Sequence, residues 1–490
     1  MFTLDVDGND SKDLVLGGST YDNLLLLIND DASPNLTSSS ISNQQSDFPA
    51  QNISTVALDL EHFPAGYYFD VNNDGINDLI CANNSTSLAK NNTNVWHYEN
   101  NNVTNNPDFS LVTTSFLQEG MIEIGEGAYP TFFDHNSDGL IDIVVGGYGY
   151  YNSAIPEYYV SSLWLYENIG TPTNPSYQLV DSNYANMNTM NLDLGNNSKT
   201  LGLAPTYGDI DGDGDIDMIV GDYIGFLHYF ENTAGAGNTA NFVLNQARYA
   251  GIDVGNNATP QLIDLNRDLL LDLVIGKENG LFTYYENIGS SSAPIFSFVT
   301  DSLGKICTRR FFEFNGNSVP YLFDDDGVYK MFSGAANGYI YLFENIDGNL
   351  TGTFSIDSSF QGIWEGIHST VNLSDINNDG KPDMLIGNYA GGAAFYEGGL
   401  FTSSNQKIED TQSIINIYPN PTRNTLNIDF GKNNIKNSSI EIMDLLGKVI
   451  YNQKVENNNI VIDLQKLPQG IYLLKFKNNL GSEIHKIIKH

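Results

Sequence analysis

The stretch APTYGDIDGDGDIDMIVGDYIGFLHYFEN, residues 204–232, is the most complete copy of a pattern that recurs along the chain. Aspartates occupy positions 1, 3, 5 and 9 of a loop: Asp209, Asp211, Asp213 and Asp217. Alternate carboxylates around a tight turn direct their oxygens at one point, and the carbonyl of Asp215 at position 7 adds another oxygen, which suits calcium. Gly214 at position 6 permits the positive φ that the turn requires. The stretch therefore predicts a calcium-binding loop.

The flanking residues distinguish this loop from an EF-hand. An EF-hand needs a bidentate Glu at position 12 and a helix on each side, whereas position 12 here is Val220. Residues 206–208 and 217–221 have the composition of short strands, and residues 225–230 that of an aromatic-rich third strand. We therefore expect the loop to join two strands.

The loop occurs six times. The predicted ligands, at positions 1, 3, 5, 7 (through its carbonyl) and 9, are Asp5, Asp7, Asn9, Ser11 and Asp13; Asp70, Asn72, Asp74, Ile76 and Asp78; Asp134, Asn136, Asp138, Leu140 and Asp142; Asp209, Asp211, Asp213, Asp215 and Asp217; Asp264, Asn266, Asp268, Leu270 and Asp272; and Asp375, Asn377, Asp379, Lys381 and Asp383. A seventh unit, around Asp324, lacks position 9, so we expect no metal there. Polar hairpin turns are the alternative, but turn propensity does not explain alternate carboxylates in six places.

Position 6 is not always glycine. Asp10 stands there in the first copy and Leu269 in the fifth. A side chain at a positive φ is strained, so both loops are expected to be altered and to bind less tightly.

The repeat extends beyond the loop. A proline lies four residues before the first Asp at Pro130, Pro205, Pro260 and Pro320, and an aromatic-Glu pair, in most copies followed by Asn, ends the third strand at Glu99, Glu167, Glu231, Glu286, Glu344 and Glu397. One more short strand follows in each unit. Four strands in each unit of roughly 50–75 residues, repeated seven times, predict an all-β, seven-bladed β-propeller.

The repeat resembles the FG-GAP or VCBS repeat of integrin-alpha-type β-propellers, whose D-x-D-x-D-G-x-x-D loop binds calcium. The resemblance covers residues 1–398 and implies five to six Ca²⁺ sites there. Residues 399–412 are polar and are expected to form a linker.

Residues 413–490 form a second predicted domain with a different charge. From Thr411 onward, ten Lys and Arg oppose six acids, a net charge of +4. Alternating strands predict a small Ig-like β-sandwich. Tyr418-Pro419-Asn420-Pro421, IEIMDLLGKVI and LPQGIYLLKFKN resemble the type A sorting domain of the type IX secretion system. The resemblance implies that the type IX machinery exports the protein, which is then released or attached to the outer surface of a Gram-negative bacterium. A generic Ig-like binding module is the alternative.

Such export also requires a signal peptide, yet the first loop follows Met1 almost at once. We therefore expect either that the chain is a piece of a longer precursor or that its start is misassigned.

Composition excludes several classes of partner. The formal net charge of −37 argues against nucleic acid and anionic membrane surfaces. No apolar run approaches the ~18 residues of a transmembrane helix. The two cysteines, Cys81 and Cys307, are expected to be free and largely buried.

No catalytic motif for a serine, metal, phosphate-binding or cysteine site is present. We therefore expect a binding or adhesion module for glycan or protein ligands at the cell surface, and not an enzyme. The alternative is a secreted polysaccharide-degrading lyase or hydrolase. A deep pocket with acids from several blades would favour the enzyme.

Two units carry extra residues between their second and third strands, a polar insert at 83–94 and an aromatic insert within 148–159. Both are expected at the end of the propeller opposite the calcium loops. Tyr150, Tyr151, Tyr158 and Tyr159 are the predicted ligand face, since tyrosines stack on sugar rings and anchor proteins. Packing of these tyrosines on each other as a lid is the alternative.

Overall fold

The protein is described by a computed structural model. It describes residues 1–19, 21–31, 40–50, 55–85, 90–102, 106–152, 159–190, 192, 200–310, 312–357, 360, 363–398, 416–430, 438–443, 448–455, 457–478 and 481–489. The chain divides into two compact units, Met1–Leu400 and Phe401–His490. The predicted linker, 399–412, lies outside the described residues.

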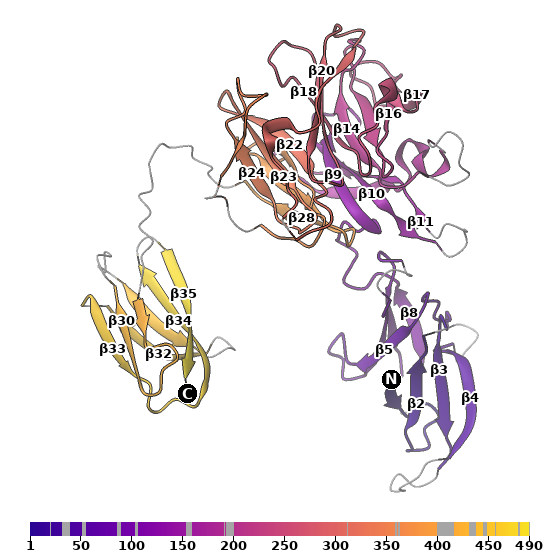
Figure 1. Cartoon of the computed structure of the whole chain (residues 1–490). Helices are drawn as coiled ribbons and strands as arrows, with labels where there is room; N and C mark the ends of the chain where they lie inside the picture. The colour runs from indigo at the N-terminus through magenta and orange to yellow at the C-terminus, as the bar shows by residue number, and fades with distance from the viewer. Residues whose placement is uncertain are drawn as a thin grey trace. The chain divides into compact units, whose positions relative to one another are not determined.

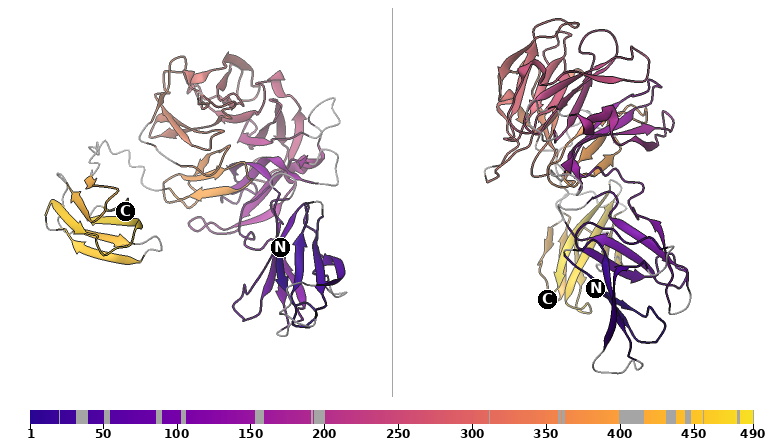
Figure 2. Two further views of the ribbon diagram at one scale, coloured as in Figure 1. Left: turned by 60° about the horizontal axis from the view of Figure 1, so that its bottom comes forward. Right: turned by 90° about the vertical axis from the view of Figure 1, so that its right-hand side faces the viewer.

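Five antiparallel sheets in the first unit follow one another along the chain (Figures 1 and 2). They are β9 (Glu126–Phe133), β10 (Asp142–Tyr151), β11 (Tyr159–Val160), β12 (Leu163–Asn168) and β13 (Tyr177–Asp181); β14 (Ala204–Gly208), β15 (Asp217–Gly221), β16 (Leu227–Asn232) and β17 (Phe242–Gln246); β18 (Thr259–Ile263), β19 (Asp272–Gly276), β20 (Phe282–Asn287) and β21 (Phe296–Thr300); β22 (Val319–Asp325), β23 (Val328–Gly334), β24 (Tyr341–Glu344) and β25 (Ser355–Ile356); and β26 (Asn372–Ser374), β27 (Asp383–Gly387) and β28 (Ala393–Tyr396). Short 3-10 helices follow the first three sheets: η1 (Tyr184–Thr189), η2 (Tyr249–Gly251) and η3 (Leu303–Lys305).

The second strand of each sheet is apolar because it is covered on both faces. The runs DMIVG of β15, DLVIG of β19 and DMLIG of β27 are buried at every residue. A strand that is half solvated would instead alternate apolar and polar residues. These runs therefore lie in the core between neighbouring sheets.

The five sheets close into a ring. A residue in or shortly before each first strand donates its backbone N–H to a carbonyl in or just after the second strand of the preceding sheet: Leu203 to Gly147, Ala258 to Asp222, Ser318 to Lys277 and Ser369 to Ala335. The fifth such bond, from Ala128 to Asn388 at 3.0 Å, joins the first sheet to the last. First strands from all five sheets line a central channel of about 320 Å³. The ring is therefore a five-bladed propeller.

The first two predicted units are not blades of this ring. They form two four-stranded sheets: β1 (Phe2–Leu4), β2 (Asp13–Gly17), β3 (Leu24–Asn29) and β4 (Ile41–Phe48); and β5 (Pro64–Phe69), β6 (Asp78–Asn83), β7 (Val95–Asn100) and β8 (Phe109–Thr113). The two sheets share one core that includes Leu24, Phe48, Leu79 and Tyr98. The all-β prediction is confirmed, but the number of blades in the ring is five and not seven.

A glycine in the second strand of each ring sheet lies where the next sheet approaches most closely. A Cβ on Gly146, Gly221, Gly276, Gly334 or Gly387 would lie 1.9–2.2 Å from a backbone carbonyl oxygen of the next sheet, so only glycine permits this approach. Gly17 has the same relation to the Pro64 carbonyl, at 1.7 Å. In β6 the corresponding residue is Ala82, whose Cβ prevents equally close packing of another sheet.

The second unit is a two-sheet β-sandwich, as the alternating pattern predicts. One sheet contains β29 (Asn416–Tyr418), β30 (Thr425–Asp429) and β33 (Asn459–Asp463), and the other contains β31 (Ser439–Met443), β32 (Val449–Lys454), β34 (Gly470–Asn478) and β35 (Gly481–Lys489). Leu426, Ile442, Ile462, Leu474 and Phe476 belong to its shared core.

Both cysteines are free, but only Cys81 is buried; Cys307 is exposed, against the prediction. Burial raises the pKa of the Cys81 thiol well above its ordinary value. Among the described residues, no helix is long and apolar enough to cross a membrane.

Candidate functional site

The six acidic loops lie where the sequence places them, between the first and second strands of six sheets. In the Asp209 loop, one oxygen each of Asp209, Asp211 and Asp217 lie within 4.8 Å of one another. The carboxylates of Asp5, Asp7 and Asp13 converge in the same way. In these two loops, positions 1, 3 and 9 therefore meet at one point.

The Asp at position 9 also holds the loop to its sheet. It is fully buried in all six copies, at Asp13, Asp78, Asp142, Asp217, Asp272 and Asp383. One oxygen of Asp217 accepts the backbone N–H of Asn232 at 2.8 Å, where the third strand ends, and the other accepts that of Ile210 at 3.0 Å. The other five copies make the same two bonds. Burial raises the pKa of Asp142 and that of Asp217 to about 6, although these N–H groups lower it.

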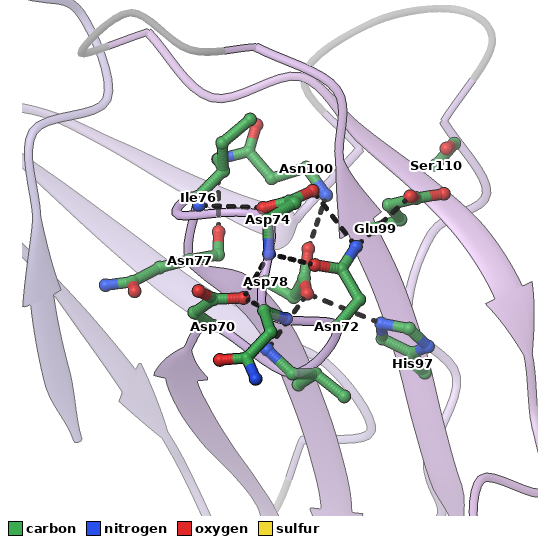
Figure 3. A network of polar contacts seen from close by, with 12 residues as sticks. Asp70, Asn72, Asp74, Ile76, Asn77, Asp78, His97, Glu99, Asn100 and Ser110 are labelled. Atoms are coloured by element: carbon green, nitrogen blue, oxygen red, sulfur yellow. Dashed lines mark hydrogen bonds and ion pairs between the residues drawn. The ribbon is translucent and has the colours of Figure 1, made fainter.

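The Asp70 loop shows what the repeated Glu of the third strand does (Figure 3). The amide nitrogen of Asn72 donates to Asp74 at 3.0 Å and to Glu99 at 3.4 Å. Asn136 makes the same contact with Glu167 at 3.0 Å, and Asn266 with Glu286 at 3.1 Å. The Glu therefore orients the residue at position 3, a role that its regular spacing after each loop could have revealed.

Positions 5 and 7 complete the turn through the backbone. An oxygen at position 5 accepts the N–H of position 7, as between Asp213 and Asp215 at 3.0 Å and between Asp379 and Lys381 at 2.9 Å. In the last copy the Lys381 ammonium also pairs with Asp379 at 3.0 Å. This copy therefore carries its own positive charge.

The turn conformation agrees with the expected strain. Gly75, Gly139, Gly214 and Gly380 at position 6 have φ of 83–93°, and Asp10 and Leu269 adopt positive φ of 64° and 73°. The Leu269 side chain is 89% exposed, so packing does not compensate for the strain.

Two observations show that a cation fits these loops. Asp134 Oδ1 is buried with no hydrogen-bond partner, and a buried carboxylate oxygen without a partner is costly. The pKa of Asp211 is raised by burial and by the charges of Asp213, Glu231 and Asp209. A bound divalent cation would give the Asp134 oxygen a partner and would offset the negative charges around Asp211.

In the unit without position 9, basic side chains form ion pairs with the acidic residues. Arg267 donates to Asp324 and to Asp347, both at 2.9 Å, and its guanidinium lies 4.0 Å from the centre of the Tyr329 ring. Lys330 pairs with Asp325 and Glu344. Arg267 lowers the pKa of Asp324.

A pocket of about 370 Å³ lies at the end of the channel opposite the acidic loops. Its lining comes from every sheet of the ring. The first sheet contributes residues of β9, β10 and β11, and the other four contribute segments that follow second strands or precede first strands. The lining residues are Glu126, Gly127, Tyr129, Tyr148, Tyr159, Tyr223, Asn257, Glu278, Asn315, Asn317, His368 and Tyr389. Tyr129 also lines the channel. Of these residues, only Tyr159 is among those that the sequence predicts for a ligand site.

Two carboxylates in the pocket are held by neutral donors. Tyr159 and Tyr389 each donate a hydroxyl to Glu126 at 3.0 Å. The amides of Asn256 and Asn315 donate to Glu278 at 2.9 and 3.3 Å. Burial and the charge of Glu126 raise the pKa of Tyr159. Burial and the hydrogen bond to Glu126 raise the pKa of Tyr389 to about 12. Both phenols therefore stay protonated.

The predicted tyrosine face is only partly accessible. Tyr159 lines the pocket, Tyr151 is 4% exposed, and Tyr150 is half-buried. Tyr148 and Tyr159 pack edge to face, with ring centres 5.8 Å apart. Tyr158 lies outside the described residues.

Two family models match the chain. Residues 416–490 match the secretion system C-terminal sorting domain, and residues 70–145 match an FG-GAP-like repeat. Both predicted resemblances are confirmed. The sorting domain implies that the protein is secreted or attached to the outer surface of the cell. The curated proteins compared with this chain include no match.

Similar solved structures include PorZ, an essential bacterial surface component of the type IX secretion system of Porphyromonas gingivalis. The two chains share 12% identity, with a TM-score of 0.28, and the match covers 96% of this chain and 63% of PorZ. This chain therefore spans less than two thirds of the length of PorZ. A GH43 glycoside hydrolase with endo-xylanase and exo-arabinofuranosidase activity shares 8% identity over 74% of this chain and 91% of its own, with a TM-score of 0.33.

Proposed function

We propose that this protein is a secreted or surface-attached calcium-binding propeller that binds a glycan or protein ligand. The convergence of Asp209, Asp211 and Asp217 carries the calcium part of the proposal. Among the described residues, no Lys or Arg forms an ion pair with those three acids, whereas Arg267 pairs with Asp324 in the unit that lacks position 9. Flexible oxygen ligands in this number favour Ca²⁺ over the smaller Mg²⁺.

Secretion supports the binding part of the proposal. A propeller with a sorting domain is delivered to the outside of the cell, where polysaccharides and surface proteins are the available ligands. The loops occupy one end of the ring and leave the opposite end, with its pocket, to contact a ligand.

A second function, polysaccharide hydrolysis or cleavage by a lyase, is favoured by one observation. Glu126 and Glu278 come from different blades and line the same pocket. Paired carboxylates serve as acid and base, or as acid and nucleophile, in most glycosidases.

One experiment separates the two functions. The purified chain in calcium is incubated with a panel of insoluble and soluble polysaccharides, and both retention and new reducing ends are measured. We expect retention without new reducing ends. Reducing ends or unsaturated products that appear with the parent and disappear in Glu126→Gln would establish the enzyme instead.

A further inference from the structure

The pocket at the channel end has a chemistry that selects among ligands. Among the residues that the structure describes, its lining contains two carboxylates and no Lys or Arg. Phosphate, sulfate and uronate groups need positive charge or helix N-termini to be held. An anionic ligand is therefore disfavoured.

The polar groups of the pocket suit hydroxyl groups. Carboxylates accept hydrogen bonds, while amides and phenols both donate and accept them. Asn257 donates to Asn317 at 3.2 Å, and Asn317 lies 3.1 Å from Nδ1 of His368, so three sheets contribute to one continuous network. Burial lowers the pKa of His368, which keeps this ring neutral near pH 7. A sugar hydroxyl, itself donor and acceptor, can join such a network at many points.

Aromatic rings supply the apolar contact that a sugar also needs. Tyr148, Tyr159, Tyr223 and Tyr389 all line the pocket. Tyr223 is 37% exposed and packs edge to face on Tyr148, with ring centres 5.3 Å apart. Aromatic rings present apolar area with a polar tip, which matches the C–H face and the hydroxyl rim of a pyranose.

A cationic ligand fits less well. Each oxygen of Glu126 already accepts a phenol hydroxyl, and each oxygen of Glu278 already accepts an amide N–H. A cation would have to displace these donors to form close ion pairs, whereas a hydroxyl can add to them because each carboxylate oxygen accepts more than one hydrogen bond.

From this lining we infer that the pocket at the channel end binds an uncharged glycosyl unit of an oligosaccharide, with Tyr223 stacked on the sugar and Glu126 bonded to its hydroxyls. The inference rests on the proposed binding function and names its ligand class and its site. The volume of the pocket, about 370 Å³, lies within the range of small-molecule sites.

Calorimetric titration of the full chain in calcium tests the inference. The probes are the hexasaccharides of glucose, xylose and mannose, with oligogalacturonate as the anionic arm and chitosan oligosaccharide as the cationic arm. We expect at least one neutral hexasaccharide to bind, and to bind more tightly than either charged probe. Tyr223→Ala and Glu126→Gln should each weaken this binding by about tenfold or more.

The matched control is Tyr67→Ala, which removes a tyrosine that is 54% exposed on β5, in the N-terminal pair of sheets. It should leave the affinity unchanged. A calcium-dependent melting transition like that of the parent shows that each variant is folded.

Three outcomes would overturn the inference. They are preference for a charged probe, unchanged affinity in both folded pocket variants, and no binding of any neutral hexasaccharide at millimolar concentration. Retention of a protein or a charged polysaccharide by the parent in those cases would leave the proposed binding function standing. If the parent protein retained no ligand of any kind, both the inference and the proposed binding function would be wrong.

Discussion

The N-terminal pair of sheets and the five-bladed ring are built from the same repeat but assemble differently. Both have acidic loops between their first two strands, and Glu-Asn ends the third strand in β7 as it does in β12, β16 and β20 of the ring. They differ at one position of the second strand, which is Ala82 in β6 and a glycine in every sheet of the ring: Gly146, Gly221, Gly276, Gly334 and Gly387. The repeat therefore specifies a sheet, and we expect the Cβ at this position to limit how closely the next sheet can pack against it.

Calcium removal is the test with the largest expected effect, because it acts on what the two regions share. A site held at about 100 times its dissociation constant contributes about 2.7 kcal/mol. Excess chelator should lower the melting temperature of the full chain by many degrees, in the ring and in the N-terminal pair alike. Calorimetry with and without chelator measures this, and identical melting curves would show that the loops need no metal.

Gly387→Ala should affect the ring alone. Its Cβ would lie 2.1 Å from the carbonyl oxygen of Ala128, at the contact that closes the ring. Forced overpacking costs about 1–3 kcal/mol, so we expect a loss of about 3 kcal/mol in urea unfolding. Ala82→Gly is the matched control, with a cost of at most about 1 kcal/mol. Equal effects of the two substitutions would contradict the role of glycine in closure.

The effect of chelation should depend on pH. Without metal, the folded-state pKa of Asp217 is raised from 3.8 to about 6. Its contribution to the stability of the metal-free ring is present below pH 3.8 and is lost as pH rises through 6, at a cost of about 3 kcal/mol. The drop in melting temperature on chelation should therefore be larger at pH 8 than at pH 5. Asp217→Asn should reduce the difference between the two pH values. A larger drop in melting temperature at pH 5 than at pH 8 would contradict the predicted pH dependence.

Leu269→Gly has the smallest expected effect. The substitution removes the backbone strain of a non-glycine residue at a φ of 73°. Little packing is lost, because the Leu269 side chain is 89% exposed. We expect a gain of about 1 kcal/mol in chelator and tighter calcium binding at the Asp264 loop. Gly214→Leu should produce the opposite change in the Asp209 loop. A loss of stability in Leu269→Gly would mean that the leucine contributes more than its exposure indicates.

Local features could be predicted from the sequence because local contacts create them. The acidic loops, the strands on either side and the positive φ at Asp10 and Leu269 depend on residues within one hairpin. Asp217 at position 9 accepts hydrogen bonds from Ile210 in its own loop and from Asn232 at the end of the third strand of the same sheet. The sorting domain was identified in the same way, from short motifs in a fixed order.

The number of blades and the pocket were decided only by the tertiary structure. Ring closure depends on contacts such as that between Thr370 and Ala128, which are 242 residues apart. Counting repeats does not show which sheets pack together, although the glycine that permits close packing is visible in the sequence once its role is known. The pocket brings Glu126, Glu278 and Tyr389 together from three sheets. None of them belongs to a local motif, because their proximity arises only when the ring closes.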